Sequence, residues 1–336
     1  MAYVLGGANN EADGFTTAIA NFALRAMHES NGMVDMTNVV TPTQGNEFLV
    51  PNFQAITYQD YNPAGAGGNT GFGNADEQNP SLAQGSITAS PAVAATAFDV
   101  FYSWTTSFQL AATLGAELGE SFAEKVDQRV AAAFASFKVT PGNTMAATSA
   151  DGFARVAQLG AMELLPSGAG PAAPTAGFTA TTVLEMIRNI KQNFKVARMP
   201  GSPVIVIDSN GNDGVIGSTL NRLLSELTGG AVNNNISALG NELLATGQIE
   251  NIYGCRVVST TFLSSASRTV DGVANTSCLV GAYFGDSALF TVIKEGLQIK
   301  SGEKPGGLQM WLTGLGYFGA GVGDLRRGGA INIQQV

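Results

Sequence analysis

The sequence predicts an α+β protein built from one very long helix, a compact α/β unit and long glycine-rich limbs. Three observations predict it. Apolar residues recur every four positions across 107–137, which indicates a single amphipathic helix. Segments after residue 203 alternate or run apolar, as strands do. A Gly/Asn-rich tract at 62–81 separates two strand-like runs and cannot pack a core by itself.

The composition provides a core but an unusually uncharged surface. Hydrophobic residues make up 45% of the chain, enough to bury a sizeable core. Charged residues make up 13%, about half the usual share of roughly 25%. Such a surface suits a subunit covered by its neighbours. It also suits an ordinary Ala/Gly-rich enzyme, and composition alone favours neither reading.

The charge pattern does not indicate tight DNA binding, and no segment is predicted to span a membrane. The net charge is −9, and the adjacent Arg326 and Arg327 stand isolated, so the basic stripe of a nucleic-acid reader is missing. A container that encloses DNA does not need such a stripe. No apolar run approaches the roughly 20 residues that span a bilayer, and the first residues do not resemble a secretory signal, so we expect neither insertion nor export.

The first hundred residues predict an arm and a long hairpin. Phe15, Ile19, Phe22 and Met27 approximate one amphipathic helix within the arm, residues 1–46. EFLVPNFQAITYQDY, from residue 47, reads as a strand whose proline suits a sheet edge. A second strand-like run extends from about 85 to 104. Because an exposed two-stranded hairpin is marginal in water, we expect it to lie on another subunit.

The long helix is expected to begin near Thr106, where Thr106 and Gln109 form a plausible capping box. We expect this helix to run to about Phe137, with an apolar stripe that starts at Leu110. The stripe consists of Leu110, Leu114, Leu118, Phe122, Val126, Val130 and Phe134.

The remaining chain predicts a weak helix, a loop and the compact unit. The weak helix covers 149–164, and PSGAGPAAPTAG forms a loop at 166–177. The compact unit then comprises a helix at 179–195 beginning at Thr179 or Thr181, a buried strand at 203–208, a helix at 218–227 and a strand hairpin at 247–263. Strands punctuated by glycine complete the chain.

No motif for catalysis is complete. His28 is the only histidine, lacks a nucleophile context, and reads as a surface residue. YVLGGANNEADG does not fit a dinucleotide loop, and the turn after Asp208 lacks the glycine and glutamate of a calcium loop. Cys255 and Cys278 suit two buried thiols or one bridge. We therefore predict no catalytic, cofactor or metal site and no enzyme activity.

The order of these pieces resembles the major capsid proteins of tailed double-stranded DNA bacteriophages, which have the Hong Kong 97-type capsid fold. Three stretches carry the resemblance. The first runs from EFLVPNFQAITYQDY through FDVFYSW into the helix 107–137, similar to the family's extended loop and spine helix. The second is TTVLEMIRNIKQNF followed by PVIVIDSNGNDGVIGSTLNRLL, similar to its axial domain. The third runs from GQIENIYGCRVVSTTFL through GDSALFTVIKEGLQIK to LTGLGYFGAGVGDLRRGGAINI, similar to its closing strands.

The resemblance implies a structural virion protein. Its subunits form hexamers and pentamers, which close into an icosahedral capsid around the phage genome after assembly in the cytoplasm of the bacterial host. The chain begins directly with its arm, so we expect a separate scaffolding protein, together with a portal and a possible decoration protein. The rivals are an encapsulin-like compartment shell, a tail or decoration protein, and a glycine-rich α/β enzyme.

The same resemblance divides the chain. It implies an arm at 1–46, an extended loop at 47–104, a peripheral domain with the spine helix at 105–177, an axial domain at 178–285, and peripheral return strands with the C-terminus at 286–336. The expected contacts between subunits are Phe15, Phe22 and Leu24 in the arm and Phe53, Tyr58, Tyr61 and Phe72 in the loop.

Overall fold

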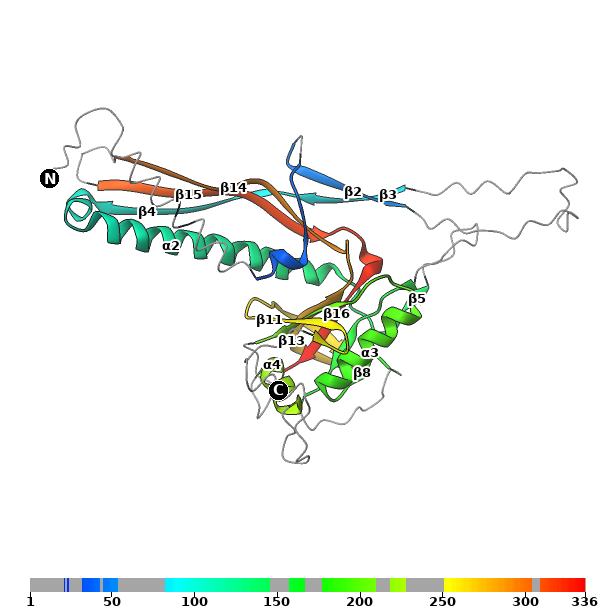
Figure 1. The fold of residues 1–336 in the computed structure, drawn as a ribbon. Helices are drawn as coiled ribbons and strands as arrows, with labels where there is room; N and C mark the ends of the chain where they lie inside the picture. Colours follow the sequence, from blue (N-terminus) through cyan, green and yellow to red (C-terminus); the bar gives the residue numbers. More distant parts are fainter. Residues whose placement is uncertain are drawn as a thin grey trace, which may run out of the picture.

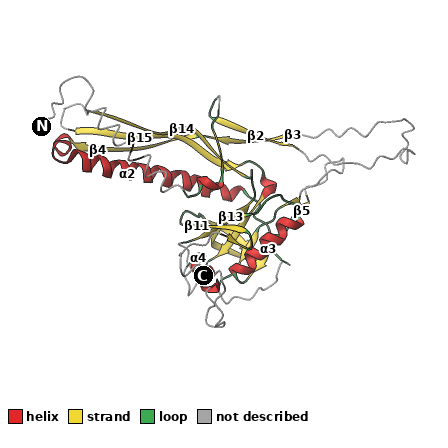
Figure 2. Cartoon of the chain, in the orientation of Figure 1, coloured by secondary structure: helices red, strands yellow, loops and turns green. Residues whose placement is uncertain are grey.

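The fold combines an elongated unit, a compact unit and a projecting hairpin (Figure 1). The computed structural model describes residues 21, 23, 32–42, 45–53, 82–145, 157–166, 177–209, 218–227, 251–303 and 309–335. The elongated unit is a four-stranded sheet with a long helix along one face, and the compact unit lies beneath one end of that helix (Figure 2). The mixture of helices and large sheets confirms the predicted α+β class.

The elongated sheet has the strand order β1-β14-β15-β4. Its central strands, β14 (Leu289–Glu303) and β15 (Gln309–Val322), are antiparallel partners. At one edge, β1 (Asn38–Val40) pairs in parallel with β14. At the other edge, β4 (Ser90–Asp99) pairs with β15 from Asp99↔Gln309 to Ser90↔Phe318. The sheet therefore joins segments more than 200 residues apart in the chain.

The helix α2 (Val100–Ala133) covers this sheet. At 1.5 Å per residue it is about 50 Å long. Leu118, Val126 and Val130 are buried beneath it, whereas Glu117 and Glu120 are exposed, as the four-residue spacing predicted. A short 3-10 helix, η2 (Phe134–Ser136), continues it. Neither α2 nor any other described helix has the length and apolarity needed to cross a membrane.

The predicted start of this helix is wrong by several residues. The helix begins at Val100 rather than near Thr106, so FDVFYSW is helical from its third residue onward. The β-branched and aromatic residues of that run favour a strand locally, but strand propensity is weak and tertiary context overrides it. Here β4 ends with Asp99 opposite Gln309, and the chain turns directly into the helix.

The compact unit is an eight-stranded sheet with the order β10-β11-β9-β13-β16-β7-β8, and with β12 also paired to β13. Its central strands are β9 (Val204–Asp208), β13 (Val273–Phe284) and β16 (Gly328–Gln334). The remaining strands are β7 (Met162–Leu164), β8 (Thr179–Ala180), β10 (Asn251–Ile252), β11 (Cys255–Thr260) and β12 (Ser265–Val270). The predicted strand at 203–208 and the hairpin at 247–263 are confirmed within the described residues.

Two helices accompany this sheet, α3 (Val183–Val196) and α4 (Thr219–Leu227). The Thr182 hydroxyl accepts a hydrogen bond from the Glu185 amide, which caps α3. The helix therefore starts after the predicted Thr179 or Thr181, because β8 occupies 179–180. The helix expected at 218–227 is confirmed as α4.

The predicted weak helix at 149–164 is wrong over its described part. That part contains the short strands β6 (Ala157–Gln158), paired with β5 (Thr144–Met145), and β7. All three residues of β7 are buried, and β7 pairs in parallel with β16. A short run buried on both faces shows no reliable period, so sheet pairing decides its structure.

Four strands join sheets across the predicted domain boundaries. β1 of the predicted arm 1–46 belongs to the elongated sheet, and β7 of the predicted segment 105–177 belongs to the compact sheet. β4 lies within the predicted loop 47–104 but belongs to the elongated sheet. β16 lies within the predicted return segment 286–336 but belongs to the compact sheet. The larger apolar core likewise includes Phe134 of η2, Phe137 directly after it, and Phe284 from β13. Phe137 and Phe284 stack with ring centroids 6.3 Å apart, so the two units share one core where they meet.

A buried carboxylate fixes the segment before β1 to α2. Asp127 in α2 is 5% exposed and accepts a hydrogen bond of 3.3 Å from the Met33 amide. Burial raises the pKa of Asp127 to about 6, and nearby Asp35 adds to the rise, while the Gly32 and Met33 amides oppose it.

Asp127→Asn should abolish a pH dependence of stability. The folded pKa of about 6 lies above the unfolded value of about 3.9, so the stabilisation from Asp127 is complete below about pH 4 and is lost as the pH rises through 6. Urea unfolding across this range should show the free energy of unfolding of the wild type falling relative to the variant by on the order of 1–3 kcal/mol. Parallel curves for the two proteins would contradict the assignment.

Candidate functional site: the root of the extended hairpin

The chemistry of an enzyme site does not gather in the described parts of the chain. No group of three or more His, Cys, Asp or Glu residues there could hold a metal ion. Cys255 and Cys278 are free and buried, so they do not form the bridge left open above. Burial raises the pKa of both thiols, that of Cys278 to about 12, which disfavours the reactive thiolate. His28 lies outside the described residues.

The most distinctive feature is instead the extended hairpin, formed by β2 (Glu47–Phe53) and β3 (Leu82–Thr88). Its strands are antiparallel from Glu47↔Thr88 to Phe53↔Leu82. Pro51 is tolerated because β2 pairs only with β3 and is therefore an edge strand. Figure 1 shows the hairpin projecting beyond the elongated sheet. Residues 54–81, which connect its strands, lie outside the described residues.

The root of this hairpin is packed against the elongated sheet by an apolar cluster. Val50, Ile87 and Ala89 from the hairpin side are buried together with Val292 of β14. The rings of Phe48 and Phe290 add a tilted contact with centroids 5.9 Å apart. The hairpin therefore leaves the subunit from a packed base.

Glycines in β15 make that close packing possible on both faces of one strand. A Cβ atom at Gly316 would lie 2.2 Å from Phe122 Cε2 of α2, and one at Gly319 would lie 2.3 Å from the Thr88 carbonyl oxygen of β3. Because side chains alternate across a strand, even-numbered positions here face α2 and odd-numbered ones face the hairpin. Gly316 thus admits the helix and Gly319 the hairpin root.

Polar contacts close the root. The Ala89 amide donates to the Asn46 carbonyl at 2.8 Å, beside the last strand pair. Lys294 Nζ donates to Asn46 Oδ1 at 2.7 Å and lies 5.2 Å from the centre of the Tyr317 ring. This lysine links β14 to the start of the hairpin.

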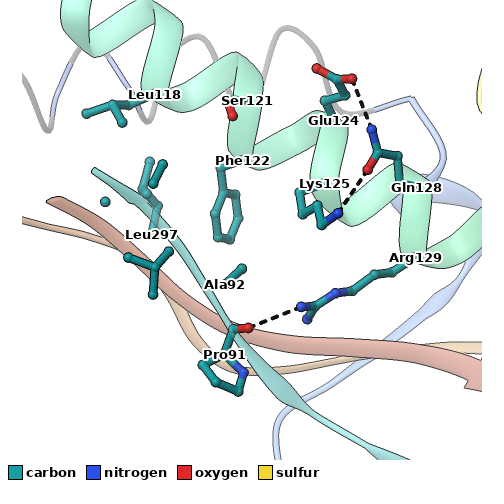
Figure 3. Close-up of a pocket in the computed structure, with 13 residues that line it drawn as sticks. Pro91, Ala92, Leu118, Ser121, Phe122, Glu124, Lys125, Gln128, Arg129 and Leu297 are labelled. Carbon is teal, nitrogen blue, oxygen red and sulfur yellow. Dashed lines mark hydrogen bonds between the residues drawn. The ribbon is translucent and has the colours of Figure 1, made fainter. Parts of the chain in front are cut away.

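An open groove of about 320 Å³ lies on the α2 face of the elongated sheet, between α2 and β4 (Figure 3). Leu118, Phe122 and Leu297 form its apolar part. Gln128 donates to Glu124 at 3.0 Å and accepts from Lys125 at 3.1 Å along the helix side. Arg129 reaches across the groove to Pro91 of β4.

A second junction connects the two units. Asp324 caps the N-terminus of η4 (Leu325–Arg327), between β15 and β16. It accepts hydrogen bonds from Arg326 and pairs with Arg327 at 3.3 Å. Burial alone would raise the pKa of Asp324, but the two arginines bring it below its usual value. Arg327 also donates to the Asp286 carbonyl at 3.2 Å. It therefore links the connection between β15 and β16 to the turn between β13 and β14.

The predicted contact residues are mostly outside the described residues. Phe53 ends β2 opposite Leu82, and the other six candidates are Phe15, Phe22, Leu24, Tyr58, Tyr61 and Phe72. Their contact role therefore stays a prediction. Sequence reasoning missed Arg129, Lys294 and Asn46, which carry no motif. The glycine spacing in LTGLGYFGAGVG was the available signal for close packing on both faces of one strand.

Comparison with known proteins is consistent with this architecture. A family model for phage capsid proteins matches residues 105–332, from α2 into β16. The solved capsid of cyanophage P-SCSP1u covers 90% of this chain and 87% of its own, at 16% identity and a TM-score of 0.59. The capsid of Ralstonia phage GP4 covers 91% and 89%, at 14% identity and a TM-score of 0.55.

The fold also extends to a virus-like particle from Pyrococcus furiosus, which covers 94% of this chain and 98% of its own, at 10% identity and a TM-score of 0.51. No curated protein matches the sequence. The solved structures carry the similarity of fold, and the family model carries the similarity of sequence.

Gly319→Ala should loosen the root of the hairpin. The added methyl would collide with the Thr88 carbonyl, so β3 must move away from β15. We expect the melting temperature to fall and amide exchange around residues 86–89 to accelerate. Gly296→Ala in β14 is the matched control, because a Cβ there meets nothing within 4 Å. Equal behaviour of the two variants would show that the close approach has no role in stability.

Proposed function

We propose that this chain, which belongs to the phage capsid protein family and is a structural protein of the capsid shell, forms hexamers and pentamers. These would close into an icosahedral capsid around double-stranded DNA. The observation that carries the proposal is the extended hairpin on a packed root. A projecting two-stranded ribbon is marginal in water alone. A neighbouring subunit would bury it.

Surface composition supports assembly from copies of one chain. Charged residues make up 13% of the sequence, and large apolar side chains such as Val39, Leu49 and Val93 are half or more exposed. Contact between subunits would remove this area from water, at roughly 25 cal/mol per Å² before ordering costs. Many weak contacts repeated by symmetry give a stable shell.

The net charge of −9 supports a container that holds DNA without binding its sequence. The family match favours this genome container over an encapsulin-like compartment shell and over an α/β enzyme. A separate scaffolding protein, a portal and a possible decoration protein complete the proposed assembly, which takes place in the host cytoplasm. The elongated unit would form the peripheral domain and the compact unit the axial domain.

Deleting 62–81 should leave a folded subunit that assembles poorly. The deletion removes the distal part of the predicted hairpin, whereas the packed root at Val50, Ile87 and Ala89 remains. Sedimentation and negative-stain images should show intact shells for the wild type and small species for the deletion, with similar circular dichroism.

Two replacements of equal length sharpen this test. A Gly/Ser segment in place of 62–81 retains length and removes the native side chains, so it separates reach from specific contact. A Gly/Ser segment in place of 167–176 is the control at another low-complexity loop, and it should assemble normally. Uniform, wild-type-like particles from the deletion would refute the role of the loop.

A further inference from the structure

Arg129 binds backbone carbonyls at the point where the hairpin leaves the elongated sheet. Its guanidinium group donates to the Ser90 carbonyl at 2.9 Å, to the Pro91 carbonyl at 3.2 Å, and to the Phe318 carbonyl. It also lies 4.2 Å from the centre of the Phe318 ring. Figure 3 shows this side chain extending from α2 to β4.

The three carbonyls mark a structural boundary. Ser90 and Phe318 are the last cross-strand pair of β4 and β15. Beyond them, Ala89 interrupts the strand, and β3 pairs with β2 instead. Arg129 therefore ties the final rung of the sheet to the helix at the point where the hairpin diverges.

This arrangement needs an arginine rather than any cation. A guanidinium group presents several donors in one plane, whereas an ammonium group is a compact point charge. The described residues include no carboxylate paired with Arg129, and burial lowers its pKa. Its donors are directed at backbone carbonyls, so its contribution is the geometry that it imposes on them.

We propose that Arg129 is a positioning residue that sets the direction in which the hairpin leaves the subunit, and thereby the uniformity of assembly. The inference rests on the proposed function, because direction matters only if the hairpin meets a neighbour. Lys294 restrains the other strand of the root through Asn46. The two cations therefore hold the chain on either side of the hairpin, Lys294 just before β2 and Arg129 just after β3.

The test compares Arg129→Lys with two controls in the same helix. Arg129→Lys retains the charge but replaces the planar guanidinium donors with a compact ammonium group. Val130→Ala removes buried apolar volume at a residue that is 1% exposed and belongs to the larger core, apart from Phe318, so it lowers global stability without removing a partner of Arg129. Gln128→Ala removes only the exposed bonds to Glu124 and Lys125.

For Arg129→Lys, we expect amide exchange at residues 86–92 to accelerate about tenfold, the effect of losing about one net hydrogen bond. Assembly should yield irregular particles and a reduced shell fraction in sedimentation. Val130→Ala should melt at a lower temperature than Arg129→Lys and still form uniform shells. Gln128→Ala should match the wild type in every measurement.

Three results would overturn the proposal. The first is unchanged exchange at 86–92 in Arg129→Lys. The second is accelerated exchange with uniform shells. The third is an assembly defect in Val130→Ala as large as that in Arg129→Lys, which would assign the effect to global stability. If Arg129→Lys does not fold, Arg129→Gln carries the same comparison. If the wild type forms no shells, the proposed function fails, whereas the exchange result still tests the clamp.

Discussion

The alternation of small residues along β15 is the constraint on which the rest of the structure depends. One strand receives α2 on one face and the hairpin root on the other, at Gly316 and Gly319. A side chain at either position would separate layers that now touch backbone to ring or backbone to backbone. Because the interior of a protein is close-packed, such a separation cannot be absorbed locally. Helix, sheet and hairpin are therefore assembled around a strand whose glycines leave room for close neighbours on both faces.

Around that strand, polar side chains act mainly on the backbone. Arg129 and Lys294 hold the hairpin root, Asp127 holds the segment before β1, and Asp324 with Arg327 holds the crossings between the two units. Each sits where the chain changes direction or changes sheet. Within the described parts, several of the few charged residues of this protein thus lie at these junctions. That distribution suits a subunit whose function is to hold a shape.

Much of this architecture could be predicted from local patterns, and the exceptions have physical causes. The four-residue spacing of Leu118, Phe122 and Val126 predicted α2, because helical burial leaves a periodic trace. The start at Val100 could not be predicted, since it depends on where β4 stops pairing with β15. β7 was missed because three buried residues carry no period. Arg129 was missed because its partners are carbonyls nearly 40 and 190 positions away, which no spacing rule reveals.

The repeated crossing between the two units has a mechanical consequence. The chain passes from η2 toward the compact sheet, returns from β13 to β14, and passes again from β15 to β16. Confined DNA repels itself and pushes its container outward. Such a force on one unit would be shared among the three chain segments that connect the units. Arg327 joins two of these segments through Asp324 and the Asp286 carbonyl. A single connecting segment would carry the whole load, whereas three connecting segments divide it among them.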